Sequence, residues 1–229
     1  MAIGAPDWQG LRWKTEVTVR PNQVWPTGKV VWQDIFDSPV HGFYEDLNGG
    51  AVILDTNYFF SRPTSLRLST DNDNTNTTSI EKYFGPVATQ KYGIEFALSI
   101  SSAVLGEFTT EIRFWDGINL NTAGIKYILA DNQWQYYDAT GNYIDAGLAS
   151  LDIEEDQDFW HRMKFTANFG TNKYIRLYFD DLEHDLTGLS FQETAQASGP
   201  LASVRFRVKP RLNSTQSVHL DNIVVTEED

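Results

Sequence analysis

Apolar residues recur at every second position in several short runs of this chain. The runs cover residues 94–100, 162–167, 175–179 and 204–209, and in each one apolar side chains alternate with polar, charged or smaller ones. Because successive side chains of a β-strand point to opposite faces, each run has one dry face and one wet face. Antiparallel sheets tolerate a wet face, whereas parallel sheets normally bury both faces under helices. The sequence therefore predicts an all-β, antiparallel fold.

Turn signals separate these runs. Asn- or Gly-containing turns stand at residues 48–50, 140–142, 170–172 and 187–188, at intervals that suit a meander or a Greek key. Long amphipathic helical patterns are absent from the sequence. The best helical candidate is the short polar stretch Gln192–Ala197, which we expect to be a connector at most.

The size and composition of the chain fit one large sandwich domain. It has 229 residues, and β-sandwiches commonly reach about 200 to 250 residues as one unit. Hydrophobic residues make up 41%, with 14 Phe, 10 Tyr and 7 Trp, and there is no cysteine. A large core is therefore available, while disulfides, thiolate catalysis and cysteine metal sites are excluded. We expect a sandwich domain over residues 29–229.

The charge of the chain argues against several partners. Asp and Glu number 31 against 18 Lys and Arg, which gives a net charge of −13. The electrostatic field of such an acidic protein repels phosphate backbones, so no nucleic-acid partner is expected. No stretch approaches the roughly 20 apolar residues that span a bilayer. The first ten residues lack the basic start and apolar run of a secretory signal. Membrane insertion is not expected, and the location stays open between the extracellular space and a larger particle.

Residues 1–28 differ from the rest and are predicted to form an extended arm. Prolines prevent a long helix there, and tryptophans are costly to leave in water. One interpretation is a strand and loop packed on the chain's own domain, and the other is an arm that packs on a neighbouring subunit of a homo-oligomer. The residues concerned are Pro6, Trp8, Trp13, Pro21, Trp25 and Pro26.

Several short motifs carry a family resemblance. The chain reads VVWQDIFDSP at residues 30–39, SRPTSLRLS at 61–69 and VHLDNIVV at 218–225, and this order resembles jelly-roll carbohydrate-binding modules. FWHRMKF at 159–165, followed by NKYIRLYFDD at 172–181, is similar to laminin-G or concanavalin A-like sandwiches. Over residues 30–225 the resemblance implies a two-sheet antiparallel jelly-roll sandwich, and it supports the fold better than any particular ligand.

The same resemblance implies a structural calcium ion. In many such modules the first and last strands share one, and the matching carboxylates here are Asp37 and Asp221. Two carboxylates with loop carbonyls suit a hard cation. The modules commonly have Glu where this chain has Asp37, and the shorter side chain weakens that match. In the alternative interpretation Asp221 hydrogen-bonds the strand edge and Asp37 is solvated.

One short stretch predicts a ligand-binding face. Glu111, Arg113 and Trp115 lie on one side of a strand, because alternate residues point the same way. A tryptophan beside charged hydrogen-bonding groups suits a sugar, whose C–H face stacks on a ring while its hydroxyls need polar partners.

Aromatic residues a little further along extend the predicted platform. They are Trp134, Tyr136 and Tyr137, with Asp116 nearby. In the alternative interpretation Trp134 and Tyr136 fill the core, while Glu111 and Arg113 form a surface ion pair.

These observations favour a noncatalytic, lectin-like module that binds a glycan or polysaccharide. A structural or adhesive subunit of a virion or cell surface is the first alternative, and a polysaccharide hydrolase or lyase is the second. A hydrolase needs two carboxyl groups at about 5 Å, or at about 6.5 to 9.5 Å, and Glu111 with Glu95 or Glu107 are the candidates. Lyases of similar shape use a Tyr, His, Arg and Gln set whose motifs this sequence does not match.

Overall fold

The computed structural model describes residues 28–61, 63–100, 105–148, 151, 153–154, 156, 158–199, 201–211 and 215–229. The predicted arm over residues 1–28 lies outside them, apart from its last residue, Gly28. Within the described part the chain forms sixteen strands and one short 3-10 helix, η3 (Leu129–Asp131). None of this helical structure is long and apolar enough to cross a bilayer.

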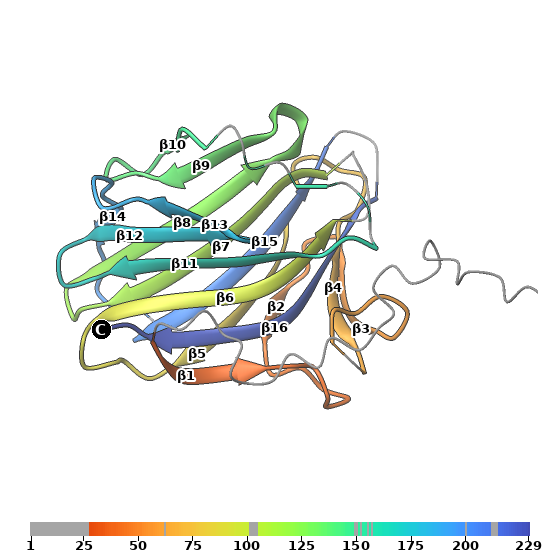
Figure 1. Cartoon of the computed structure of the whole chain (residues 1–229), viewed down its shortest axis with the longest axis horizontal. Coiled ribbons are helices and arrows are strands. Elements are labelled where there is room, and N and C mark those ends of the chain that lie inside the picture. Colours follow the sequence, from red (N-terminus) through yellow and green to blue (C-terminus); the bar gives the residue numbers. More distant parts are fainter. Residues whose placement is uncertain are drawn as a thin grey trace, which may run out of the picture.

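The strands form two antiparallel sheets that pack face to face (Figure 1). Sheet 1 has the order β13 (Leu182–Asp185), β12 (Lys173–Phe179), β11 (His161–Asn168), β6 (Lys91–Ile100), β16 (Ser217–Glu227), β4 (Ser65–Ser69) and β3 (Ala51–Asp55), with β1 (Lys29–Asp34) paired to β16. Sheet 2 has the order β10 (Tyr143–Asp145), β9 (Gln133–Tyr137), β8 (Asn119–Ile128), β7 (Leu105–Trp115), β15 (Ala202–Pro210), β5 (Thr78–Phe84) and β2 (Tyr44–Asp46), with β14 (Gln192–Ala195) paired to β8.

The core lies between the two sheets and is built from the apolar members of the alternating runs. Phe96 of sheet 1 meets Phe206 of sheet 2 edge to face, with ring centroids 5.0 Å apart, which is a favoured geometry for aromatic pairs. Around Phe206 the alternation separates buried positions from partly exposed ones. In β6 both faces are buried from Tyr92 to Ile100, so the wet face expected for the run 94–100 is absent. The predicted all-β, two-sheet antiparallel sandwich is therefore confirmed.

The helical expectation at Gln192–Ala197 is wrong. Gln192–Ala195 is the edge strand β14, in which Gln192 pairs with Thr122 and Thr194 with Leu120. The polar composition reflects the edge position, because the residues of this strand are mostly exposed. The backbone of β14 gains ladder hydrogen bonds from β8, and this outweighs a weak local helical preference.

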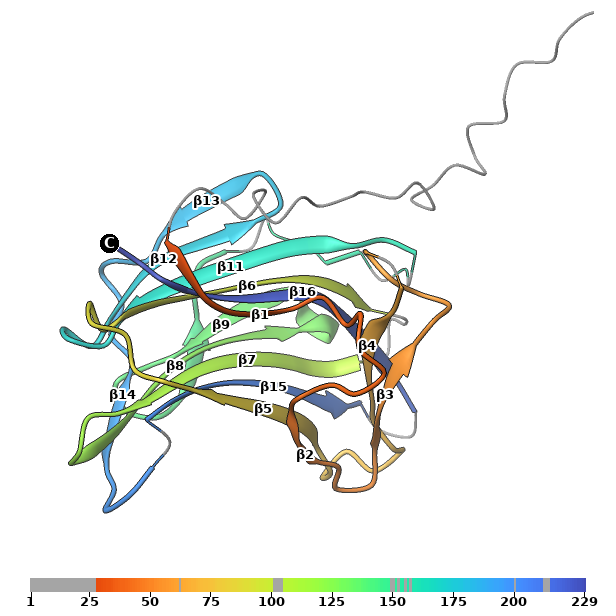
Figure 2. The same ribbon diagram turned by 90° about the horizontal axis from the view of Figure 1, so that it is seen from below.

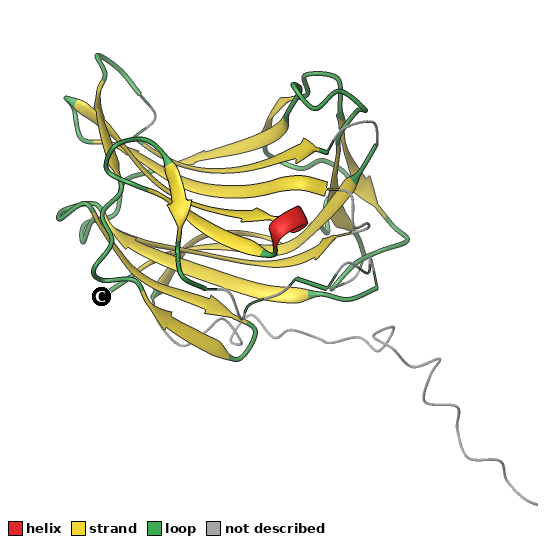
Figure 3. Cartoon of the chain, turned by 90° about the horizontal axis from the view of Figure 1, so that it is seen from above, coloured by secondary structure: helices red, strands yellow, loops and turns green. Residues whose placement is uncertain are grey.

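Sheet 2 is curved, so its outward face is hollow. Figure 2 shows its central strands β8, β7, β15 and β5 in the middle of the curve, with turns and loops extending beyond them at both ends. Figure 3 shows the curved sheets from the opposite side. One end carries the turn after β7 and the chain that follows β14, and the other carries the loop between β2 and β3. The polar members of the alternation in β15 lie on this hollow face, Arg205 and Arg207 among them.

Candidate functional site

A row of directly paired residues crosses the hollow face of sheet 2. Tyr44 pairs with Glu81, Glu81 with Arg205, Arg205 with Glu111, and Glu111 with Gly124. Directly opposite residues share a face of the sheet, and neighbouring strands lie about 4.8 Å apart. The row therefore runs for about 20 Å across β2, β5, β15, β7 and β8.

The Glu111 carboxylate is the centre of this face. It is only 4% exposed, and its Oε2 accepts hydrogen bonds from Arg205, from Nε at 2.9 Å and from Nη2 at 2.6 Å. Its Oε1 accepts from the Tyr143 hydroxyl at 2.9 Å and lies 3.5 Å from Nη2 of Arg207. Charge-assisted bonds of this kind fix the geometry of both partners. Burial would lower the pKa of Arg205, but the charge and hydrogen bond of Glu111 outweigh burial and raise it.

Gly124 makes room for the bond between Tyr143 and Glu111. A Cβ atom at Gly124 would lie 2.9 Å from the Tyr143 hydroxyl oxygen and 3.1 Å from Cγ of Glu111, closer than carbon atoms normally approach. The phenol can therefore cross the β8 backbone only because this residue has no side chain. Burial, reinforced by the charge of Glu111, raises the pKa of Tyr143 above its usual value, so the phenol stays protonated and donates.

A tyrosine of sheet 1 contacts the backbone of Gly124 in sheet 2. The Tyr174 hydroxyl, on β12 of sheet 1, accepts a hydrogen bond from the Gly124 N–H at 2.8 Å. It also lies 2.9 Å from the Gly124 carbonyl and 3.0 Å from the Tyr137 carbonyl, to either of which it can donate. The ladder between β8 and β9 ends at Ile125 and Tyr136. The Tyr174 hydroxyl thus satisfies backbone groups that the ladder leaves unpaired.

A second carboxylate organises the neighbouring part of the face. Glu81 Oε1 accepts a hydrogen bond from Nη1 of Arg113 at 2.9 Å and from the Ser203 hydroxyl at 2.6 Å. Its Oε2 lies 3.3 Å from the Tyr83 hydroxyl. The guanidinium of Arg113 is therefore held by β5, not by Glu111 on its own strand.

The side chains around Glu111 enclose a groove of about 250 Å³. Three arginines and one carboxylate are its charged lining residues, and the others are aromatic, hydroxyl or amide side chains, with one leucine. The groove is thus locally cationic, although the whole chain carries a net charge of −13. Its lining is Glu111, Arg113, Leu120, Thr122, Tyr137, Tyr143, Gln192, Thr194, Gln196, Arg205 and Arg207.

The structure brings together three of the residues that the sequence singled out, namely Glu111, Arg113 and Tyr137. Sequence reasoning missed Arg205, Arg207 and Tyr143. A signal was present for the two arginines, because they occupy the polar positions of the alternating run 204–209. Nothing in the sequence placed that run beside the strand that carries Glu111.

One of the expected platform residues, Trp134, lies in the core, and a second, Tyr136, is partly buried and packs against it. Trp134 is 1% exposed, its ring centroid lies 4.8 Å from that of Tyr127, and its Nε1 donates to the Leu151 carbonyl at 2.6 Å. Tyr136 packs edge to face on Tyr174 at 5.7 Å. The expectation that their rings face a ligand is wrong, because the same alternation that turns Tyr137 outward turns both of them inward.

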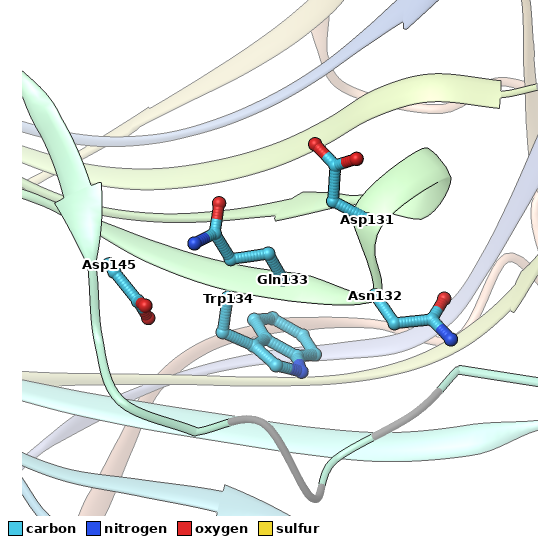
Figure 4. Close-up of a pocket in the computed structure, with 5 residues that line it drawn as sticks. All are labelled: Asp131, Asn132, Gln133, Trp134 and Asp145. Atoms are coloured by element: carbon cyan, nitrogen blue, oxygen red, sulfur yellow. The ribbon is translucent and has the colours of Figure 1, made fainter.

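Trp134 also borders a second pocket of about 290 Å³ (Figure 4). The other lining residues are Asp131, Asn132, Gln133 and Asp145. Figure 4 shows the indole turned away from the side chains of Asp131 and Gln133. The pocket therefore offers polar side chains from η3 and the residue that follows it, from the first residue of β9 and from β10, and no aromatic platform.

Trp115 keeps its predicted face but lies at the end of the groove. Its Nε1 donates to the Gln196 carbonyl at 3.0 Å, and its backbone N–H donates to the Leu201 carbonyl. The ring is partly covered and does not line the groove. Its contacts attach the segment that follows β14 to the end of β7.

The carboxylate pairs considered for hydrolysis do not meet. Glu95 belongs to β6 of sheet 1, where it binds Arg162 at 3.1 Å, so both sheets separate it from Glu111. Glu107 stands four residues before Glu111 on β7, which corresponds to about 14 Å along a strand. Both separations exceed those of glycosidase carboxylates, about 5 to 9.5 Å.

Asp37 and Asp221 do not fit a calcium ion. Oδ2 of Asp221 accepts the backbone N–H groups of Phe60 and Ser61, at 2.9 and 2.7 Å, and Oδ1 accepts from Asn222 N–H and the Ser61 hydroxyl. Calcium needs oxygen atoms that face the ion, whereas these two oxygens face hydrogen-bond donors. Asp37 is exposed, and the described residues contain no group of three or more His, Cys, Asp or Glu placed to hold a metal.

Comparisons with solved structures identify the fold. An endo-β-1,4-glucuronan lyase from the fungus Trichoderma reesei superposes with a TM-score of 0.62 at 13% identity, over 86% of this chain and 95% of that one. A carbohydrate esterase from the Shiga toxin-encoding bacteriophage phi24B gives 0.58 at 15% identity, over 88% and 100%. A Bacillus subtilis protein with a galectin-like fold gives 0.53 at 12% identity, over 87% and 96%.

These likenesses support the concanavalin A-like jelly-roll sandwich inferred from the sequence motifs. At such low identity they establish the fold alone. No family model matches the sequence, and no curated protein matches it.

Proposed function

We propose that the protein binds an anionic polysaccharide in the groove of sheet 2 without cleaving it. The observation that carries this proposal is the set of three guanidinium groups, from Arg113, Arg205 and Arg207, that line a groove on a strongly acidic protein. Guanidinium groups bind carboxylates with favourable planar geometry. A polymer with carboxylate-bearing sugar units satisfies this charge.

The rest of the lining suits the neutral parts of a sugar. Tyr137 offers part of an aromatic ring, and Thr122, Thr194 and Gln192 offer hydroxyl and amide groups. Glycan hydroxyls need such partners, and their C–H faces stack on rings. The T. reesei protein of the same fold is named for its action on glucuronan, which supports an acidic glycan as the first ligand to test.

Arg207 provides the sharpest test of the arginine groove. Its guanidinium is the least engaged of the three, because its contact with Glu111 is 3.5 Å long. In a calorimetric titration with glucuronan oligosaccharides we expect Arg207→Gln to lower the affinity about tenfold, as a charged hydrogen bond is lost. Lys209→Gln is the matched control, since it removes the same charge two positions along β15, outside the groove lining.

Two results would overturn the proposal. One is an affinity for glucuronan, alginate and polygalacturonate no higher than that for neutral xylan. The other is an equal loss of affinity in Arg207→Gln and Lys209→Gln, because the loss would then come from the change in net charge and not from a contact in the groove. Binding in the predicted mode weakens as salt is added, because the groove is open to solvent and its charges are screened.

A polysaccharide lyase is the second candidate, favoured by the presence of tyrosine, arginine and glutamine side chains in one groove. No histidine is among the described lining residues. Arginines that neutralise a uronate carboxylate would acidify the neighbouring C–H group, and the Glu111 carboxylate would take its proton as the C–O bond breaks. Tyr143 would give its proton to the leaving oxygen and recover one from Glu111 through their 2.9 Å hydrogen bond. Incubation with glucuronan would then release products with a new C=C bond, seen by ultraviolet absorbance and lost in Tyr143→Phe.

The proposal of a structural or adhesive subunit depends on the arm over residues 1–28, most of which lies outside the described residues. It stays a prediction, and gel filtration of the full chain against a chain without these 28 residues tests it.

A further inference from the structure

Two tyrosines are strongly exposed on the hollow face, away from the arginine groove. Tyr44 on β2 is 71% exposed and Tyr83 on β5 is 52% exposed. Large aromatic rings left in water at one place usually mark a surface that binds something. Neither residue lines the groove described above, and neither contributes to the core.

The pairing of the strands puts both tyrosines on the groove face. Tyr44 stands directly opposite Glu81, and Tyr83 lies two residues beyond Glu81 on the same strand. Side chains at i and i+2 of a strand, and at directly opposite positions, point to the same side. The two rings therefore flank Glu81 on the hollow face.

Glu81 connects this pair to the arginines. One of its oxygens lies 3.3 Å from the Tyr83 hydroxyl, and the other accepts from Arg113 at 2.9 Å. Ser203, directly opposite both Tyr83 and Arg113, lies between them in the sheet. Polar groups thus continue without interruption from the groove to the exposed rings.

We propose that Tyr44 and Tyr83 form a second, aromatic subsite, which takes a further sugar unit of the same anionic polysaccharide that occupies the groove. This inference rests on the proposed function and adds the direction and length of the ligand. A ligand that fills the groove and also covers both tyrosines crosses the strands from β8 to β2, which is a span of about 19 Å. That span requires an extended oligosaccharide of several units, because a monosaccharide or disaccharide cannot reach both ends.

The chemistry of the subsite favours a sugar over an apolar partner. The two rings provide faces for C–H groups, while Glu81 and Ser203 provide hydrogen-bond partners beside them. An apolar protein partner would bury the ion pair of Glu81 and Arg113 in its interface, and the desolvation of both charges is costly. The acidic units of the polymer lie at the arginines, and its hydroxyl-rich faces lie on the tyrosines.

The test compares ligand lengths by calorimetry on the full chain. We expect the wild type to bind a glucuronan hexasaccharide more tightly than a glucuronan disaccharide, because only the longer ligand reaches the tyrosines. A Tyr44→Ala, Tyr83→Ala double variant should lose about 25-fold in affinity for the hexasaccharide, from about fivefold per ring. Its affinity for the disaccharide should stay unchanged.

Matched variants separate stacking from other effects. The Tyr44→Phe, Tyr83→Phe double variant keeps both rings and should bind the hexasaccharide within about twofold of the wild type. Leu182→Ala removes a 51% exposed apolar side chain from β13 of sheet 1 and should have no effect. Unchanged melting temperatures would show that each variant is folded.

The possible failures are distinguishable. If the alanine variant binds the hexasaccharide as the wild type does while Arg207→Gln weakens it, the aromatic subsite is wrong and the proposed function stands. If the alanine variant weakens binding while Arg207→Gln does not, the subsite stands and the arginine groove is wrong. If the wild type binds neither glucuronan ligand, both proposals are wrong for this polymer and the subsite is rejected with the groove.

Discussion

The hydroxyl of Tyr143 donates a 2.9 Å hydrogen bond to the carboxylate of Glu111, although two strands separate β10 from β7 in the sheet. The bond exists because Gly124, on the intervening strand β8, leaves its space to the phenol. The side chain of Tyr143 thereby connects the edge strand β10 with the central strand β7. This contact shapes the groove, and the arginines give the groove its charge.

Replacement of Tyr143 by Phe removes that bond. We expect the free energy of unfolding to fall by about 1 to 3 kcal/mol, because the lost acceptor is a charged group, and the affinity for an acidic oligosaccharide to fall with it. Urea denaturation and calorimetry measure the two effects. Tyr44→Phe, which changes an exposed phenol, should leave the stability unchanged; equal behaviour of the two variants would contradict the role given to Tyr143.

Gly124→Ala tests the space between the strands. The added Cβ atom would collide with the Tyr143 hydroxyl and with Glu111, so we expect a loss of about 1 to 3 kcal/mol in stability and weaker ligand binding. Gly188→Ala is the control, because a Cβ atom there meets nothing within 4 Å. The role of Gly124 is wrong if its alanine variant is as stable and as active in binding as the Gly188 variant.

Trp134→Ala separates a core tryptophan from a binding tryptophan. It removes a ring that is 1% exposed and a hydrogen bond to Leu151, so we expect a loss of about 3 to 5 kcal/mol from the cavity that it leaves. Trp115→Ala, at a partly covered position, should cost clearly less. Chemical denaturation followed by far-ultraviolet circular dichroism measures both, and a stable Trp134→Ala protein with impaired ligand binding would restore the platform interpretation.

Asp221 predicts a pH dependence of stability. Burial raises its pKa from 3.8 to about 7, against the opposing effect of its N–H donors. The folded protein then holds a proton that the unfolded chain releases between about pH 4 and pH 7, so the contribution of Asp221 to stability falls as pH rises through this window. The full loss amounts to at most about 4 kcal/mol.

His219 titrates in an overlapping range with the opposite sign, because burial lowers its pKa although Asp55 opposes this. The measured quantity is therefore the difference in unfolding free energy between the wild type and Asp221→Asn. We expect the wild type to lose its advantage as pH rises from about 4 to about 7. A difference that is flat over this range contradicts a raised pKa at Asp221.

Calcium should not stabilise the pair formed by Asp37 and Asp221. The Asp221 oxygens face hydrogen-bond donors that an ion would have to displace. We expect the same melting temperature in excess calcium and in excess chelator. A calcium-dependent rise in melting temperature that disappears in Asp37→Asn would show that the protein binds calcium as the resemblance to calcium-bearing modules implies.

The sequence alone determined the strands of the alternating runs and, in the stretch 111–115, the faces of the side chains. Ile112 and Phe114 enter the core while Glu111 and Arg113 face outward, as the alternation predicts. The direction of a side chain on a strand is a local property of the backbone, so it can be read without knowing any neighbour. The same rule would have separated Tyr136 from Tyr137, which as adjacent residues cannot share a face.

The tertiary structure decided which outward faces meet. Arg205 and Glu111 are 94 residues apart in sequence, and Tyr174 reaches Gly124 from the opposite sheet over a separation of 50 residues. Strand order and register come from the combined packing of the whole core, and no short motif encodes them. The charged groove exists because β15 lies between β5 and β7, and only long-range pairing places it there.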